Sequence, residues 1–302
     1  MKTKKIMAIL LASIISILTM TMNVVASNNI TFSHRNDINE FASNIANVYI
    51  AKYPSEYIMI NNIIGEIVNK DVFIECYESD GKAAFQIVED SLRDALEPSV
   101  FALKNGKYYV SVPTVSQVCY HPKTGEELHY YCGPASALQA LIGNGKLSNI
   151  AQNQNSQKVY DVGSEMGTDS SGTNISNLTS YMQKYYKSTS ITYKTKAFTR
   201  FTYDKAIDFV KYSLQNGAAP VIRIDDTSVL DYYSSKEESL THYVTISEVD
   251  TINNTVTLVD PNYELKYQGS HTITMDEFIK LVNINGWISV YTNVKTGSYV
   301  YE

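Results

Sequence analysis

The stretch HYYCGPASALQALIGNG, His129–Gly145, carries the signals of one helix with a cysteine at its start. Pro134 suits a first helical turn, where a missing N–H costs no hydrogen bond and the fixed φ is already helical. Apolar residues then recur at helical spacing, and the Gly-Asn-Gly sequence at 143–145 is typical of a helix C-terminus. The sequence therefore predicts a helix that begins at Cys132 and packs one face into a core.

The position of Cys132 has a chemical consequence. Unpaired backbone N–H groups and the helix dipole at a helix N-terminus favour a thiolate, which is the reactive form of cysteine. Gly133 is expected to let the backbone come close to a substrate. The alternative is that Cys132 is a small buried apolar residue, as many free cysteines are, and the helix alone does not separate the two.

A second segment, residues 240–263, predicts a β-hairpin. A two-residue Asn-Asn turn would place Asp260 far from His242 and on the wrong face. A five-residue loop over 250–254 satisfies both apolar patterns and pairs Asp260 with Val244, so that its carboxylate lies diagonal to His242 on one face. We therefore expect an imidazole base beside an orienting carboxylate. Taken singly, a strand-end histidine is often a surface residue, and Asp-Pro is an ordinary start of a turn.

Gln117 precedes the cysteine and supplies a neutral side-chain N–H donor. Such a donor, together with the backbone N–H of Cys132, would stabilise a developing oxyanion. A single glutamine carries little weight, and its value lies in the order Gln, Cys, His, Asp.

That order, with VPTVSQ, YCGPASALQAL, HYVTISEVD and LVDP, resembles the secreted C39-like peptidases over roughly residues 107–294. These are papain-like cysteine peptidases, relatives of the bacteriocin-exporter domain that cleaves leader peptides after a double glycine. The resemblance implies an α+β papain-like fold, in which the cysteine helix packs against an antiparallel sheet that bears the histidine and the aspartate. By motif it makes Cys132 the nucleophile, His242 the general base and then acid, Asp260 the orienting residue and Gln117 the oxyanion donor.

The sequence departs from the family pattern in the fourteen residues 118–131, where the family usually has only a few. This insertion either forms a flap over the cleft or displaces Gln117 from the oxyanion site. Cys119 is an alternative nucleophile, but it lacks the Gly-Pro helix entrance. His129 is an alternative base that is close to the cysteine in sequence, yet it lies on a loop.

Three regions are expected along the chain. Residues 1–26 read as a signal peptide, with lysines, an apolar run and the cleavage sequence Val-Val-Ala. An uncleaved membrane anchor is the alternative, because the run approaches spanning length. The mature protein is thus predicted to be secreted, extracellular or cell-surface associated, with no later membrane contact. Residues 27–105 form an N-terminal accessory or pro-region, and residues 106–302 the peptidase domain.

The N-terminal region is predicted to be a small α+β segment. It has one helix near 37–52, strands within 57–89 around a hairpin turn at Asp80-Gly81, and a strand pair joined at Asn105-Gly106. This region either covers the cleft until it is removed, which would be autoinhibition, or stays as a substrate-binding domain.

The peptidase domain continues with a surface loop containing short helical pieces over 149–177. Helices follow near 175–186 and 202–215, then the strands PVIRI, THYVTISEV and NTVTLVD, a short helix at 275–283 and the strand GWISVYTNV.

Composition narrows the function classes. The net charge of −6 argues against nucleic-acid partners and anionic lipid. The cysteines, Cys76, Cys119 and Cys132, are odd in number, so at least one thiol is left unpaired. The sequence has no CxxC or HExxH motif, and we expect neither a metal nor a cofactor.

Together these features predict a secreted cysteine peptidase that acts on peptide or protein substrates through a thioester. Two alternatives use the same scaffold: a non-catalytic binding module, and an acyltransferase or amidase with the same catalytic residues.

Overall fold

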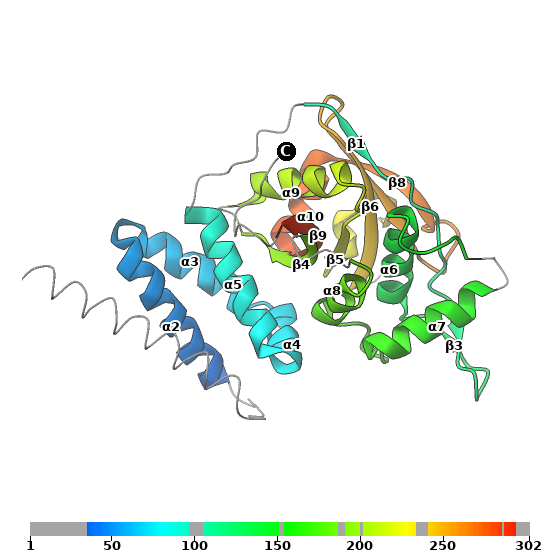
Figure 1. Cartoon of the computed structure of the whole chain (residues 1–302), viewed down its shortest axis with the longest axis horizontal. Helices are drawn as coiled ribbons and strands as arrows, with labels where there is room; N and C mark the ends of the chain where they lie inside the picture. The colour runs from blue at the N-terminus through cyan, green and yellow to red at the C-terminus, as the bar shows by residue number, and fades with distance from the viewer. Residues whose placement is uncertain are drawn as a thin grey trace, which may run out of the picture.

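The computed structural model describes residues 35–96, 105–150, 154–186, 191–199, 202–233, 241–285 and 287–293 (Figure 1). The predicted signal peptide, residues 1–26, lies outside these ranges. Within them, no helix has both the length and the apolar character needed to cross a membrane.

The N-terminal part of the chain is helical wherever it is described before residue 97. Its elements are α2 (Arg35–Lys52), the 3-10 helix η1 (Pro54–Glu56), α3 (Tyr57–Val68), α4 (Asp71–Ser79) and α5 (Gly81–Leu96). The predicted helix near 37–52 is confirmed by α2. We refer to residues 35–96 as the helical unit.

The strands predicted within residues 57–89 are wrong, because the apolar residues there follow the helical period. Ile60, Ile63, Ile64 and Ile67 are buried at i, i+3, i+4 and i+7 on one face of α3. The predicted hairpin turn at Asp80-Gly81 joins two helices instead. There the Asp80 side chain accepts a hydrogen bond from the backbone N–H of Ala83 (3.0 Å) in the first turn of α5.

The rest of the chain forms a sheet with helices on it. The described residues form a seven-stranded antiparallel sheet of order β4-β9-β5-β6-β7-β8, with β1 paired to β6. Its strands are β1 (Lys107–Tyr109), β4 (Ile191–Ala197), β5 (Val221–Ile224), β6 (His242–Asp250), β7 (Thr255–Asp260), β8 (Gly269–Thr274) and β9 (Trp287–Asn293). A separate small hairpin consists of β2 (Cys119–Tyr120) and β3 (Glu127–Leu128).

The helices of this part are α6 (Cys132–Gly143), α7 (Asn155–Met166), α8 (Ile175–Gln183), α9 (Tyr203–Gln215) and α10 (Met275–Asn285), with short 3-10 helices η3 (Thr227–Val229) and η4 (Asp231–Tyr233). In Figure 1, β6 passes between α6 and the pair α9 and α10. This arrangement confirms the predicted α+β papain-like fold, with the cysteine helix packed on an antiparallel sheet.

Most elements described after residue 106 match the sequence predictions. The helices α6, α8, α9 and α10 and the strands β5, β6, β7 and β9 lie where they were expected. Gly145, just after α6, has φ 65°, which is the left-handed conformation that ends helices. The loop predicted over 149–177 contains the twelve-residue helix α7, and β4 and β8 were not predicted. The strand β1 pairs with β6, whereas its predicted partner, residues 99–103, lies outside the described ranges.

The β6–β7 hairpin reaches the predicted register by a different route. Thr245 lies opposite Val259, the register that sets Val244 against Asp260. The connecting loop, residues 251–254, is one residue shorter than predicted. A register shift between Ile246 and Glu248 supplies the missing residue as a β-bulge. His242 and Asp260 therefore lie on one face, as the apolar patterns required.

Candidate active site

Cys132 is held at the start of α6 by polar bonds between that helix and β6. The Ser136 hydroxyl donates to the carbonyl of Tyr243 (3.0 Å), and the Thr245 hydroxyl donates to the carbonyl of Ser136 (3.0 Å). These groups are buried, so the two hydrogen bonds fix the position of α6 along the direction of β6. The N-terminus of α6 thereby lies at the end of β6 that bears His242.

Gly133 has a different role from the one predicted. A Cβ at this position would lie 2.7 Å from Oγ1 and 2.8 Å from Cβ of Thr173. The missing side chain therefore makes room for residue 173 of the chain itself, rather than for a substrate. Thr173 is held in turn by the hydroxyl of Tyr243, which donates to its carbonyl (2.6 Å).

His242 lies between Asp260 and Cys132. Its Nε2 is 2.8 Å from Oδ1 of Asp260, and Cys132 lies close enough to raise the pKa of the imidazole. Cys132 is 8% exposed, His242 3% and Asp260 0%. The structure thus brings together three of the four residues that the sequence singled out.

The environment of His242 favours the imidazolium. Burial lowers the pKa of His242, but the charge and hydrogen bond of Asp260, together with those of Cys132, outweigh burial and raise it to about 10. A protonated imidazole beside a cysteine at a helix N-terminus is an arrangement that stabilises a thiolate.

Three further residues bind Asp260, and sequence reasoning did not identify them. The hydroxyls of Tyr233 (2.9 Å) and Tyr232 (3.1 Å) donate to Oδ2, and the backbone N–H of Asn262 donates to Oδ1 (2.8 Å). Asn262 could have been suspected, because Asp-Pro-Asn suits a turn in which the aspartate binds the N–H two residues on. The sequence offers no such signal for the two tyrosines of η4.

Gln117 is buried close to the aspartate. Its backbone N–H donates to the carbonyl of Pro261 (2.8 Å), the residue after Asp260. Its side-chain Nε2 donates to the carbonyl of His129, while Oε1 has no hydrogen-bond partner among the described residues. One of the two Nε2 hydrogens is thus used by the insertion.

The insertion 118–131 is a hairpin that packs on α7. Cys119 of β2 lies opposite Leu128 of β3, and both are buried. At its end the ring of Tyr131 fills the space above Gly163 of α7, where a Cβ would lie only 2.2 Å from the ring. The insertion therefore packs against α7 and holds Gln117 through the carbonyl of His129.

The other thiols are poor alternatives to Cys132. Cys76, Cys119 and Cys132 are all free and buried. Burial raises the pKa of the Cys76 thiol to about 11 and that of Cys119 to about 12, which disfavours the thiolate.

The other described histidines have partners elsewhere. His129 lies 3.1 Å from the Glu127 carboxylate and packs edge-on against Tyr263. His121 accepts hydrogen bonds within its own turn, from the backbone of Lys123 and Thr124.

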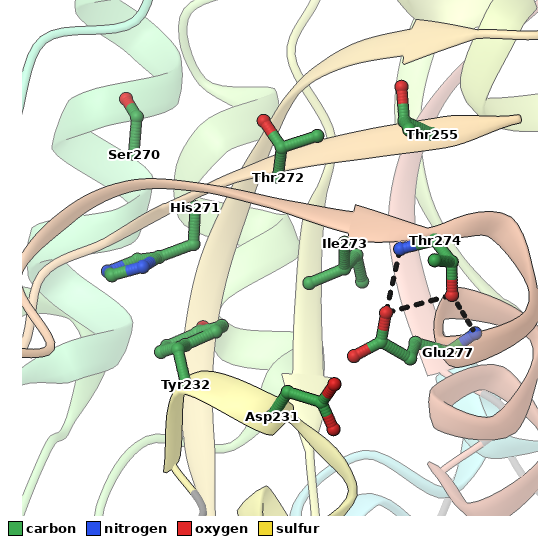
Figure 2. Close-up of a pocket in the computed structure, with 9 residues that line it drawn as sticks. All are labelled: Asp231, Tyr232, Thr255, Ser270, His271, Thr272, Ile273, Thr274 and Glu277. Carbon is green, nitrogen blue, oxygen red and sulfur yellow. Dashed lines mark hydrogen bonds between the residues drawn. The ribbon is translucent and has the colours of Figure 1, made fainter. Parts of the chain in front are cut away.

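His271 lies in a pocket behind η4, which Figure 2 shows. There its ring stacks on Tyr232, with centroids 3.9 Å apart. The pocket is lined by Asp231, Tyr232, Thr255, Ser270, His271, Thr272, Ile273, Thr274 and Glu277. Because Cys132 and His242 do not line it, we do not assign substrate binding to this pocket. Across the described parts of the chain, no group of three or more His, Cys, Asp or Glu residues is placed to hold a metal ion.

Comparison with known proteins agrees with this geometry. The sequence model of the Peptidase C39-like family matches residues 109–292, more than half of the chain. A comparison with curated protein sequences gives no match. The matched region begins in β1 and ends in β9, so it includes α6, β6 and β7 and excludes the helical unit.

Proposed function

Because the chain belongs to the Peptidase C39-like family, we propose that it is a cysteine peptidase whose nucleophile is Cys132. The family supports a cysteine peptidase-like scaffold, and the contact of Cys132 with His242, itself bound to Asp260, carries the proposal further. A nucleophile needs a base within hydrogen-bond reach, and the base needs an orienting group. The burial of Cys132, His242 and Asp260, and the bond of His242 to Asp260, support this assignment.

The reaction follows from which atoms are engaged. Nε2 of His242 faces Asp260, so Nδ1 is the nitrogen left to share a proton with the Cys132 sulfur. The thiolate attacks the peptide carbonyl carbon, and the backbone N–H of Cys132 and the second Nε2 hydrogen of Gln117 are the donors proposed to stabilise the resulting oxyanion. His242 then gives its proton to the leaving amine, which departs and leaves a thioester on Cys132.

The thioester is cleaved by water. His242, now neutral, takes a proton from the water as its oxygen attacks the thioester carbonyl. The C–S bond then breaks and the carboxylic acid leaves. The Cys132 thiolate and the protonated His242 imidazole are thereby restored. Asp260 keeps the imidazole oriented through both halves of the reaction.

The proposal includes export of the protein. Residues 1–26 would direct the chain out of the cell and be removed, and the mature protein would act on peptides or proteins there. N-terminal sequencing of the secreted form tests the cleavage site and also shows whether residues 27–105 persist.

The test of the chemistry is selective alkylation of the folded chain with iodoacetamide near pH 7, read by peptide mass spectrometry. We expect Cys132 to be modified far faster than Cys76 and Cys119, which are internal controls with raised pKa values. Cys132→Ala is expected to abolish cleavage of a peptide library. Equal labelling of the three thiols, together with cleavage that survives Cys132→Ala, would exclude this nucleophile. Absence of both labelling and cleavage in the wild-type chain would favour a binding module.

A further inference from the structure

Asp260 receives more hydrogen bonds than an orienting carboxylate requires. Its Oδ1 accepts from Nε2 of His242 and from the backbone N–H of Asn262, both at 2.8 Å. Its Oδ2 accepts from the hydroxyls of Tyr233 and Tyr232, at 2.9 and 3.1 Å. An ionised carboxylate offers about four lone-pair sites. All of them are therefore used, although the residue is fully buried.

The direction of the Tyr233 hydroxyl is fixed by a further bond. Nδ2 of Asn262 donates to the Tyr233 oxygen (2.7 Å), so the single hydroxyl hydrogen is left to point at Asp260. Burial and the Asp260 charge hold the pKa of both tyrosines well above the ordinary value, so both hydroxyls remain donors.

Both tyrosine rings are also held by stacking. The Tyr232 ring stacks on His271 of β8, and Figure 2 shows the two side chains together. Their centroids are 3.9 Å apart and their planes 5° apart. The Tyr233 ring lies on Tyr267 at 4.6 Å and 10°. Two consecutive residues of η4 are thus fixed independently of each other, and both point their hydroxyls at one oxygen of Asp260.

We propose that Tyr232 and Tyr233 are positioning residues that lock the Asp260 carboxylate so that Oδ1 stays directed at His242. This inference rests on the proposed function of the Cys132 site. The two hydroxyls oppose rotation of the carboxylate, because a turn out of its present plane would break the four hydrogen bonds that this fully buried group accepts. The hydroxyls of both tyrosines bind Asp260 rather than Cys132 or His242, although the Tyr233 ring packs edge-on against the His242 ring, with centroids 6.1 Å apart.

Loss of the lock has a specific electrostatic result. The titratable groups described around His242 are Cys132 from α6, Asp260 from β7 and Tyr233 from η4. If Asp260 turns away, burial continues to disfavour the imidazolium while its main counter-charge is lost. The pKa of His242 then falls from about 10 toward about 6.5, its ordinary value.

The experiment compares Tyr232→Phe, Tyr233→Phe and the double variant with Tyr181→Phe. Tyr181 is a buried tyrosine of α8 whose hydroxyl binds that of Tyr185 (2.9 Å), so its variant also loses one hydroxyl bond. The His242 imidazole is titrated by NMR with labelled histidine, using His242→Gln to assign its signal. The pH profile of kcat/KM on a cleaved peptide is measured in parallel.

We expect each single variant, and the double variant more strongly, to move the His242 titration and the alkaline limb of kcat/KM to lower pH. We expect kcat to fall about tenfold or more with little change in KM, since general acid–base catalysis contributes about 10²- to 10⁴-fold. Tyr181→Phe is expected to leave the His242 titration and the pH profile of kcat/KM unchanged. The proposal is overturned if the folded single variants titrate like Tyr181→Phe.

The NMR titration separates this inference from the proposed function, because it needs no turnover. A displaced His242 titration in a chain that cleaves nothing would support the lock and contradict the peptidase. Cleavage by the wild type, with an unchanged His242 titration in the tyrosine variants, would support the peptidase and contradict the positioning role of the tyrosines. The single variants keep the test decisive should the double variant fail to fold.

Discussion

At the scale of single residues, His242 shows how a buried site keeps a charge. Burial alone would make this imidazole neutral, yet Asp260 and Cys132 raise its pKa to about 10. Because the folded-state pKa lies above the unfolded value of about 6.5, this contribution to stability is fully present below about pH 6.5. It is lost as pH rises through about 10. In the proposed mechanism, the same group must be protonated to release the amine.

The pH dependence of activity follows from the raised pKa of His242. We expect kcat/KM for peptide cleavage to remain high through neutral pH and to fall as pH approaches about 10, where His242 loses its proton. Asp260→Asn keeps the shape of the side chain but removes its charge, so the descending limb should move to lower pH. A limb that stays in place in this variant would show that Asp260 does not set the protonation of His242.

At the scale of elements, the site depends on how closely α6, α7 and the insertion approach one another. Gly163 of α7 leaves space for the ring of Tyr131, the residue immediately before Cys132, and Pro134 of α6 lies against the same position. The Tyr131 ring also stacks near Tyr160 of α7, with centroids 6.1 Å apart. One glycine thus couples the insertion to the start of the cysteine helix.

Gly163→Ala is therefore expected to destabilise the fold by about 1–3 kcal/mol, the usual cost of overpacking. Gly65→Ala is the matched control, because Gly65 lies inside α3 with open space at the Cβ position. There the gain in helix propensity predicts a neutral or slightly stabilising change, of up to about 1 kcal/mol. Urea unfolding of both variants provides the measurement. Equal effects at the two glycines would refute close packing at Gly163.

At the scale of the whole molecule, the helical unit lies beside the sheet (Figure 1), and ion pairs join the two. Lys196 of β4 is fully buried, and its ammonium lies 3.1 Å from Asp94 and 3.7 Å from Asp90, both on α5. Arg223 of β5 pairs with Glu75 of α4 at 2.7 Å. Separation of the two parts would remove Asp94 and Asp90 from the buried Lys196, whereas Arg223 would keep its pair with Asp225 (2.9 Å). We therefore expect residues 35–96 to stay with the sheet.

Lys196→Met tests this attachment. Removal of one partner from a buried ion pair typically costs about 3–5 kcal/mol, because the other charge stays buried, and Asp94 would be left in that position. Lys184→Met removes an exposed pair with Glu165, for which we expect a loss below about 1 kcal/mol. Thermal unfolding of the full chain distinguishes them. Similar small losses of stability in the Lys196→Met and Lys184→Met variants would mean that the helical unit is only loosely attached to the sheet.

Local signals in the sequence were sufficient for the core of the site. Pro134 and the glycines around α6 predicted a helix that starts at Cys132, because caps and helical spacing act over a few residues. Strand parity placed His242 and Asp260 on one face, since the two-residue period leaves few registers that bury both apolar sets. The bulge near Ser247 shortened the connecting loop by one residue but left the register of His242 and Asp260 as predicted.

Other features required the folded chain. The short apolar runs of the helical unit were read as strands, because periodicity over so few residues does not separate the two structures. Burial raises the pKa of the Cys76 and Cys119 thiols, and composition does not reveal which thiols are buried in this way.

The sequence alone thus determined the cysteine helix and the face shared by His242 and Asp260, because both depend on backbone periodicity and nearest neighbours. Only the tertiary structure decided that Tyr232 and Tyr233 bind Asp260, and that Thr173, rather than substrate, fills the space at Gly133. Those contacts join segments 27 to 40 residues apart, and their geometry depends on how α6, η4 and β7 pack together.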